Sequence, residues 1–183
     1  MKKVILLIVF FICITSETTL SQGFKSNQCV GELIPPPTGV SEEIDNNLLN
    51  LAQKVEWKGG ICNGAVFRTT DQLEVYRVYD KTHRYTKSGS WWIFTNPNDM
   101  TEERFRTSYA VCRIWGGGHT SYLNSLRKCK IEIGSKIVIG TTQSVRCGKD
   151  KSYQQTKAIQ IFIPTETTDK LIDCTDLGKW PNK

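Results

Sequence analysis

The sequence predicts a secreted α+β domain whose strands form mixed or antiparallel sheets, and three observations point to this class. Short runs of β-branched and aromatic residues, which favour strands, are interspersed with two stretches whose apolar residues recur at helical spacing. The cysteine content and the first residues are typical of an exported chain held by disulfides. The strands are too unevenly spaced for an immunoglobulin-like sandwich.

The N-terminus has the layout of a secretory signal peptide. A basic region at residues 1–3 precedes an apolar run over residues 4–14, which is too short to span a bilayer. Cleavage after Ser21, at the end of signal residues 1–21, would leave residues 22–183 as a single extracellular domain with its core at about 62–164. An uncleaved anchor is the alternative. No other run is long and apolar enough for a membrane helix.

The chain has seven cysteines, and one of them, Cys13, lies in the predicted signal peptide. An even number in a secreted chain predicts that the others form three disulfides, but it does not determine their connectivity. These are Cys29, Cys62, Cys112, Cys129, Cys147 and Cys174. They include no Cys-x-x-Cys pair, so we expect no metal site. The formal net charge of +6 favours weak attraction to anionic partners without identifying nucleic acid as a target.

Periodicity places the expected elements along the chain. A first helix should begin at Ser41, and a second should begin at Asp99, which forms a capping box with Glu102. The apolar residues that recur at helical spacing in the first are Ile44, Leu48, Leu51 and Val55. Strands are predicted over residues 65–67, 74–80, 90–94, 130–133, 136–139 and 158–163.

Arg77 interrupts the most regular of these strands. It lies on the same face as Val75 and Tyr79, where a guanidinium is costly to bury unless an anion meets it. A protein carboxylate, exposure on an edge strand, or a phosphate or carboxylate of a ligand would each satisfy it. Gln160 is a second polar residue in the middle of a strand. If the two strands are neighbours, a cation and an amide face one cleft with Trp91 or Trp92 nearby, which suits a dinucleotide with a cationic ring.

Several short motifs occur in an order that resembles ADP-ribosyltransferase-fold toxin domains. They are Val-Tyr-Arg-Val-Tyr (75–79), Gly-Ser-Trp-Trp (89–92), Asn-Pro-Asn-Asp-Met-Thr-Glu-Glu-Arg-Phe-Arg (96–106), Tyr-Ala-Val (109–111) with Trp115, and Ile-Gln-Ile-Phe-Ile-Pro (159–164). No single motif is specific, and their order over residues 74–164 carries the resemblance. It implies a single domain with an NAD cleft between mixed or antiparallel sheets.

The resemblance also implies roles for individual residues. Arg77 would hold NAD⁺, Trp91 or Trp92 would stack on nicotinamide, and Gln160 would be the catalytic residue of the late strand. Tyr79 and Ser90 complete the implied NAD-binding set, and His119 in a Gly-rich loop is the candidate third catalytic residue, with His83 as its competitor. NAD⁺ is then a substrate, and no other cofactor is expected.

The late strand departs from the pattern of the transferases. It reads Gln160-Ile161-Phe162 and lacks the glutamate of their Glu-x-Glu or Gln-x-Glu motif. The necrotising-toxin-type NAD glycohydrolases use glutamine at this place, which favours cleavage of NAD⁺ by water over ADP-ribosyl transfer to a protein acceptor. Two other classes remain open. A secreted ribonuclease could use His83 and His119, and a non-enzymatic binding protein could present its aromatic residues to a partner.

Overall fold

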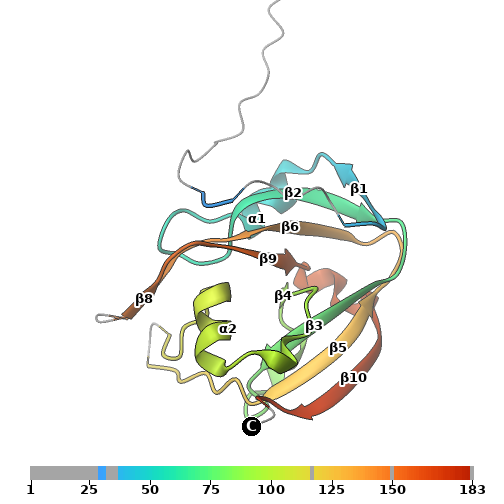
Figure 1. Cartoon of the computed structure of the whole chain (residues 1–183). Helices are drawn as coiled ribbons and strands as arrows, with labels where there is room; N and C mark the ends of the chain where they lie inside the picture. The colour runs from blue at the N-terminus through green and yellow to red at the C-terminus, as the bar shows by residue number, and fades with distance from the viewer. Residues whose placement is uncertain (1–28, 32–36, 116–117, 149–150, 182–183) are drawn as a thin grey trace, which may run out of the picture.

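A computed structural model describes residues 29–31, 37–115, 118–148 and 151–181 of the chain (Figure 1). They form an α+β fold of mostly antiparallel sheets with two α-helices, as the sequence predicts. The predicted signal peptide lies outside the described residues. Within the described ranges, no helix is long and apolar enough to cross a membrane.

The larger sheet has five strands in the order β1-β2-β6-β9-β4, and every pair is antiparallel. Its strands are β1 (Val40–Glu43), β2 (Ile61–Thr69), β4 (Trp91–Trp92), β6 (Lys136–Thr142) and β9 (Thr156–Phe162). Strand β9 therefore lies between β6 and the short strand β4, which carries both tryptophans of the Gly-Ser-Trp-Trp motif.

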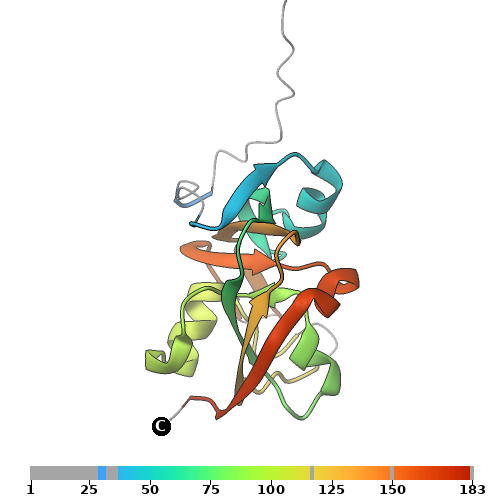
Figure 2. The same cartoon turned by 90° about the vertical axis from the view of Figure 1, so that its right-hand side faces the viewer.

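The second sheet has three antiparallel strands in the order β10-β5-β3. They are β3 (Leu73–Tyr79), β5 (Ser125–Ile131) and β10 (Leu171–Lys179), and a separate hairpin joins β7 (Val145–Cys147) to β8 (Lys151–Tyr153). In Figure 1, β3, β5 and β10 run obliquely to β6 and β9, and α2 lies where the two sheets diverge. Figure 2 shows the same division after a quarter turn.

The turn at residues 134–135, between β5 and β6, separates the two sheets. Gly134 adopts φ +83° and its N–H donates to Thr69 O, which turns the chain sharply after β5. Strands β5 and β6 are consecutive in the sequence, yet they belong to different sheets. This turn makes the inner faces of both sheets contribute to one core.

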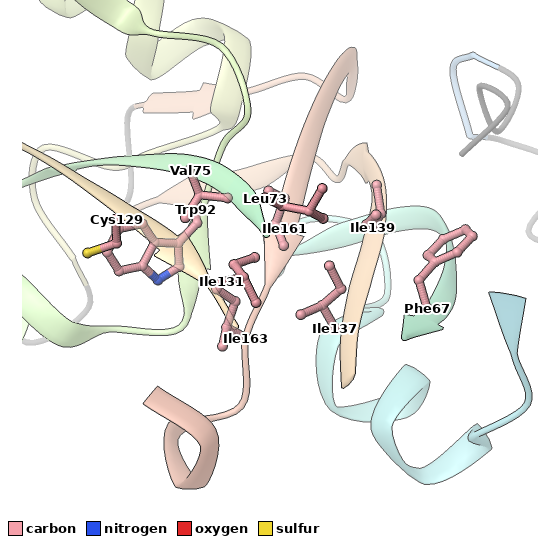
Figure 3. Packing of buried hydrophobic residues seen from close by; sticks show 10 residues of the cluster. All are labelled: Phe67, Leu73, Val75, Trp92, Cys129, Ile131, Ile137, Ile139, Ile161 and Ile163. Atoms are coloured by element: carbon pink, nitrogen blue, oxygen red, sulfur yellow. The ribbon is translucent and has the colours of Figure 1, made fainter. Parts of the chain in front are cut away.

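The main hydrophobic core lies between the sheets and is drawn in Figure 3. It comprises Phe67, Leu73, Val75, Trp92, Cys129, Ile131, Ile137, Ile139, Ile161 and Ile163. Side chains of β3 and β5 meet those of β6 and β9 there, so burial of apolar area fixes how the sheets pack. That packing sets the relative position of Arg77 on β3 and Gln160 on β9.

Both helices begin later than the sequence predicts. Residues 40–43 form β1, and α1 (Asn46–Ala52) begins after Asp45, whose carboxylate accepts from Leu48 N. Of the four apolar residues that recur at helical spacing only Leu48 is buried, and Ile44 is 90% exposed. Helix α2 (Glu102–Tyr109) is capped by Thr101, and not by Asp99. The 3₁₀ helices are η1 (Arg84–Ser88), η2 (Pro97–Asp99) and η3 (Thr165–Lys170).

Three disulfides confirm that the six cysteines beyond the predicted signal peptide are paired. The bonds are Cys29–Cys62, Cys112–Cys147 and Cys129–Cys174. Cys129–Cys174 joins β5 to β10 within the three-stranded sheet. Cys112–Cys147 joins the segment after α2 to β7. The disulfides therefore reinforce contacts between segments that are distant in sequence.

Candidate functional site

A cavity of about 410 Å³ is lined by residues of both sheets. Its lining residues come from β3, β4, β9, the end of α2 and the loop between α1 and β2. Its volume lies in the range of small-molecule sites, which is roughly 300–1,000 Å³. Most of the lining is apolar or aromatic, and the polar groups within it are few and individually placed.

Arg77 extends from β3 to this cavity, and its donors meet backbone carbonyls. Its Nε donates to Thr86 O at 2.6 Å and its Nη1 to Trp91 O at 2.5 Å, and the guanidinium lies 5.9 Å from the ring centre of Trp92. Among the described residues, no carboxylate forms an ion pair with it. Burial lowers the pKa of Arg77 to about 10, which expresses the cost of removing the cation from water. An anionic ligand would offset that cost.

Arg77 and Gln160 line the same cavity, together with Trp91 and Trp92, but they do not lie on neighbouring strands. The expectation of adjacent strands is wrong, because β3 and β9 belong to different sheets. The segment after β4 joins the two sheets instead. Strand β4 pairs with β9, and Ile93 exchanges backbone hydrogen bonds of 2.8 and 3.0 Å with Tyr76, next to Arg77.

Gln160 is held with its amide in one orientation. Its Nε2 donates to Tyr109 O at 3.0 Å and to Thr142 Oγ1 at 2.8 Å, and the side chain is buried. Since a backbone carbonyl only accepts hydrogen bonds, the atom facing Tyr109 O must be the nitrogen. Both amide hydrogens are therefore used. The carbonyl oxygen Oε1 remains as the acceptor that this residue can offer to a ligand.

The two tryptophans of β4 have different environments, as expected of adjacent residues on a strand. Trp92 is 1% exposed and its indole N–H donates to Gly89 O, so it belongs to the core. Trp91 is half-buried and its ring centre lies 5.0 Å from that of Phe162. Trp91 is therefore the aromatic surface that is more accessible to a ligand.

Of the other predicted site residues, only one lines the cavity. Tyr79 lines the cavity, with its hydroxyl 3.5 Å from Asp176 Oδ1. Ser90, His83 and His119 are not among the lining residues. His119 is exposed, and its backbone carbonyl accepts from Trp115 N at 2.9 Å. The cavity therefore assembles Arg77, Gln160, Tyr79 and the tryptophans without a histidine.

Asp80 is a lining residue that the sequence did not single out. Burial acts to raise its pKa, but hydrogen bonds from Thr82, Tyr122 N and His83 outweigh it and lower the pKa. Oδ1 accepts from the N–H and hydroxyl of Thr82, and Oδ2 accepts from Tyr122 N at 2.9 Å. Because these donors occupy the carboxylate, Asp80 holds the loops around the cavity and does not neutralise Arg77.

Further lining residues were also missed. Tyr109 ends α2, and burial raises its pKa, so its hydroxyl stays protonated and is able to donate. Lys54 and Lys58 line the cavity as exposed cations. No sequence signal distinguishes these two lysines from the many others. Among the described residues, no cluster of three or more His, Cys, Asp or Glu side chains could hold a metal ion.

Comparison with protein-family models, with curated proteins and with solved structures finds no match to this chain. The argument for function therefore rests on the geometry and electrostatics of the cavity.

Proposed function

We propose that the protein is a secreted NAD⁺ glycohydrolase that cleaves the nicotinamide–ribose bond. The observation that carries the proposal is the guanidinium of Arg77, removed from water and without a carboxylate partner in the described part of the chain, in a cavity that it shares with Trp91 and Gln160. This combination supplies one group for each part of the nicotinamide end of NAD⁺. Arg77 is a cation for a phosphate, Trp91 is an aromatic ring for nicotinamide, and Gln160 is an acceptor for a ribose hydroxyl. The ordered resemblance to ADP-ribosyltransferase-fold toxin domains agrees with it.

In the proposed reaction, Arg77 binds a phosphate of the pyrophosphate and Trp91 stacks on the nicotinamide ring. The bond between C1′ of the ribose and the ring nitrogen breaks, and its electron pair leaves with nicotinamide. The ribose then resembles an oxocarbenium ion, and Oε1 of Gln160 accepts a hydrogen bond from a ribose hydroxyl as positive charge develops. Water adds at C1′ and releases its proton to solvent, which gives ADP-ribose. No strong base is required because the leaving group departs as a neutral molecule.

The test is incubation of the purified chain with NAD⁺ and chromatography of the products. We expect nicotinamide and ADP-ribose to appear in equal amounts. Arg77→Lys keeps the charge but loses the forked geometry, so kcat/KM should fall by about tenfold or more. Gln160→Ala should lower kcat more than it raises KM, because the lost contact strengthens in the transition state.

Two exposed residues provide matched controls. Arg104→Lys makes the same chemical change on the surface of α2, and Gln72→Ala removes an exposed amide. Both should retain wild-type activity and thermal stability. Two results together would refute the proposal and favour a binding protein. Wild-type protein at high concentration would leave NAD⁺ intact, and Arg77→Ala would bind ADP-ribose as tightly as wild type.

Transfer of ADP-ribose to a protein is the second outcome that the same cavity supports. Gln160→Glu places an acid on the late strand, as in the transferases, so it should increase the ratio of transferred to hydrolysed ADP-ribose if a protein acceptor is supplied. A parallel incubation with fluorogenic RNA tests the ribonuclease alternative. The cavity favours the dinucleotide over RNA because neither His83 nor His119 lines it.

A further inference from the structure

The turn between α1 and β2 carries apolar and basic side chains together on the surface. Residues 54–58 read Lys-Val-Glu-Trp-Lys, and a hydrogen bond of 3.2 Å from Lys58 N to Val55 O closes the turn. Val55 is 73% exposed, although glycine and polar residues are the usual occupants of turns. Trp57 is half-buried. Because a turn of four residues is compact, these side chains share one small surface.

Trp57 has a backbone conformation that a large side chain rarely adopts. Its φ is +67°, in the left-handed region, where Gly59 and Gly60 after it also lie. A tryptophan held in an unfavourable backbone conformation at a surface turn indicates a use for its ring. The guanidinium of Arg146 on β7 lies 5.7 Å from the centre of that ring, and the backbone N–H of Arg146 donates to Trp57 O. The ring is therefore held at the surface beside a cation.

Buried polar residues after β6 hold the turn in place. Gln143, which is 4% exposed, donates from Nε2 to Lys54 O at 3.0 Å. Ser144, which is 1% exposed, accepts from Trp57 N through its hydroxyl and from Gly59 N through its carbonyl. These bonds fix the backbone of an exposed turn before any partner binds, so that binding requires little further ordering.

Three cations lie around the apolar side chains of this turn. Lys54, Lys58 and Arg146 are exposed, and none of them forms an ion pair within the described ranges. Glu56 is the only carboxylate of residues 54–58, so three positive charges less one negative charge leave +2. The aliphatic stems of lysine and arginine lie along apolar surface while their charged ends stay in a polar layer. We call the patch formed by Lys54, Val55, Trp57, Lys58 and Arg146 the Trp57 surface.

An anionic lipid bilayer is complementary to both properties of the Trp57 surface. Its acidic headgroups attract exposed cations, and its boundary between headgroups and acyl chains accepts valine and favours tryptophan. A nucleic acid or an acidic polysaccharide would pair with the same cations but would leave Val55 in water. We propose that the Trp57 surface binds the surface of anionic membranes. This inference does not depend on the proposed cleavage of NAD⁺.

Sedimentation with lipid vesicles tests the proposal. We expect the purified chain to bind vesicles of phosphatidylcholine with about one third phosphatidylserine at least about tenfold more tightly than vesicles of phosphatidylcholine alone. Lys58→Gln should weaken binding to the acidic vesicles by about fivefold, since it removes one basic residue near the headgroups. Val55→Ser should weaken it by about tenfold, because apolar carbon is lost from the contact.

Trp57→Gly separates membrane binding from folding. Glycine removes the ring and also relieves the positive φ, so the melting temperature should stay close to that of wild type while vesicle binding falls by about tenfold or more. Two exposed residues elsewhere provide matched controls. Lys179→Gln on β10 and Ile133→Ser, between β5 and β6, should both bind vesicles as wild type does.

Binding to heparin distinguishes a lipid surface from polyanions in general. Lys58→Gln should weaken heparin binding, whereas Val55→Ser should leave it unchanged. The proposal is overturned if wild type does not sediment with the acidic vesicles, or if it binds the neutral vesicles equally well. It is also overturned if Val55→Ser and Trp57→Gly retain vesicle binding that Lys58→Gln loses, because charge alone would then explain the interaction and a polyanion would be the better partner.

Discussion

The guanidinium of Arg77 occupies the space that a side chain at Gly89 would need. A Cβ added at Gly89 would overlap Nη2 of Arg77 and lie 2.9 Å from its Cζ. The backbone of Gly89 has φ −72° and ψ 168°, an extended conformation that alanine adopts without strain. The glycine of the Gly-Ser-Trp-Trp motif is therefore required by the arginine and not by the backbone.

Gly89→Ala should displace the Arg77 guanidinium while leaving the fold intact. Because the clash involves the end of a flexible side chain, we expect little change in melting temperature. Binding of ADP-ribose should weaken by about tenfold, which corresponds to roughly 1.4 kcal/mol. Calorimetric titration of wild type and variant measures this.

The double variant Gly89→Ala/Arg77→Ala is the decisive control. If Gly89→Ala acts through Arg77, the double variant should bind no more weakly than Arg77→Ala alone, because the two changes remove one interaction. Additive losses would show instead that the methyl group obstructs the ligand directly.

Arg106 organises the wall of the cavity that follows α2. It is 2% exposed and donates to Glu102, to the carbonyls of Val111 and Cys112, and to Ser121 O at 2.6 Å. Arg106→Lys cannot reach all of these acceptors from one compact ammonium group, so several would lose their donor. We expect the free energy of unfolding to fall by about 2–4 kcal/mol, measured by urea denaturation.

Arg104 on the same helix provides the control for this change. Its side chain is exposed, so Arg104→Lys should alter stability by no more than about 0.5 kcal/mol. A loss for Arg106→Lys that is no larger than this control would contradict the structural role assigned to Arg106.

Local patterning predicted the strands that carry the site but not how they assemble. The alternation around Arg77 and Gln160 is local, and β3 and β9 lie close to the ranges that it indicated. The partition into two sheets depends on the turn at Gly134 and on packing between distant residues, which a single sequence does not display. Pairing of β3 with β9 was therefore wrong, although the shared cavity was expected.

Other errors have equally specific causes. Ser41 followed by acidic residues resembles a helix start, yet these residues pair with β2, because tertiary pairing overrides local preference. Strand β10 was missed since most of its side chains are exposed and it lacks apolar alternation. His119 was chosen for its Gly-rich surroundings, but it is exposed and does not line the cavity.

The disulfide Cys129–Cys174 should strongly stabilise the three-stranded sheet. It joins β5 to β10 in the main core and closes a loop with a sequence separation of 45. The double variant Cys129→Ala/Cys174→Ala avoids a free thiol, and chain entropy alone predicts a loss of about 4 kcal/mol in the free energy of unfolding. Urea denaturation of the variant measures the loss.

Thiol labelling provides an independent check of all three disulfides. Unreduced, denatured protein without its predicted signal peptide should contain no free thiol, since all six cysteines are bonded. Detection of even one reactive thiol per chain would contradict the pairing.

Asp80 should make stability depend on pH in the acid range. Despite its burial, hydrogen bonds from Thr82, Tyr122 N and His83 lower its pKa in the folded state below the ordinary value of 3.8. A carboxylate with a lowered folded pKa contributes stability that is complete above the unfolded pKa and is lost as pH falls through the folded pKa.

The free energy of unfolding should therefore decrease below about pH 4. Asp80→Asn should make this decrease at acid pH less steep while lowering stability at neutral pH. Urea denaturation at steps from about pH 6 to about pH 2.5 gives both curves. Asp99→Asn, at an exposed carboxylate of η2, should leave this decrease as in wild type. A decrease that is equally steep with and without the Asp80 carboxylate would show that other groups cause it.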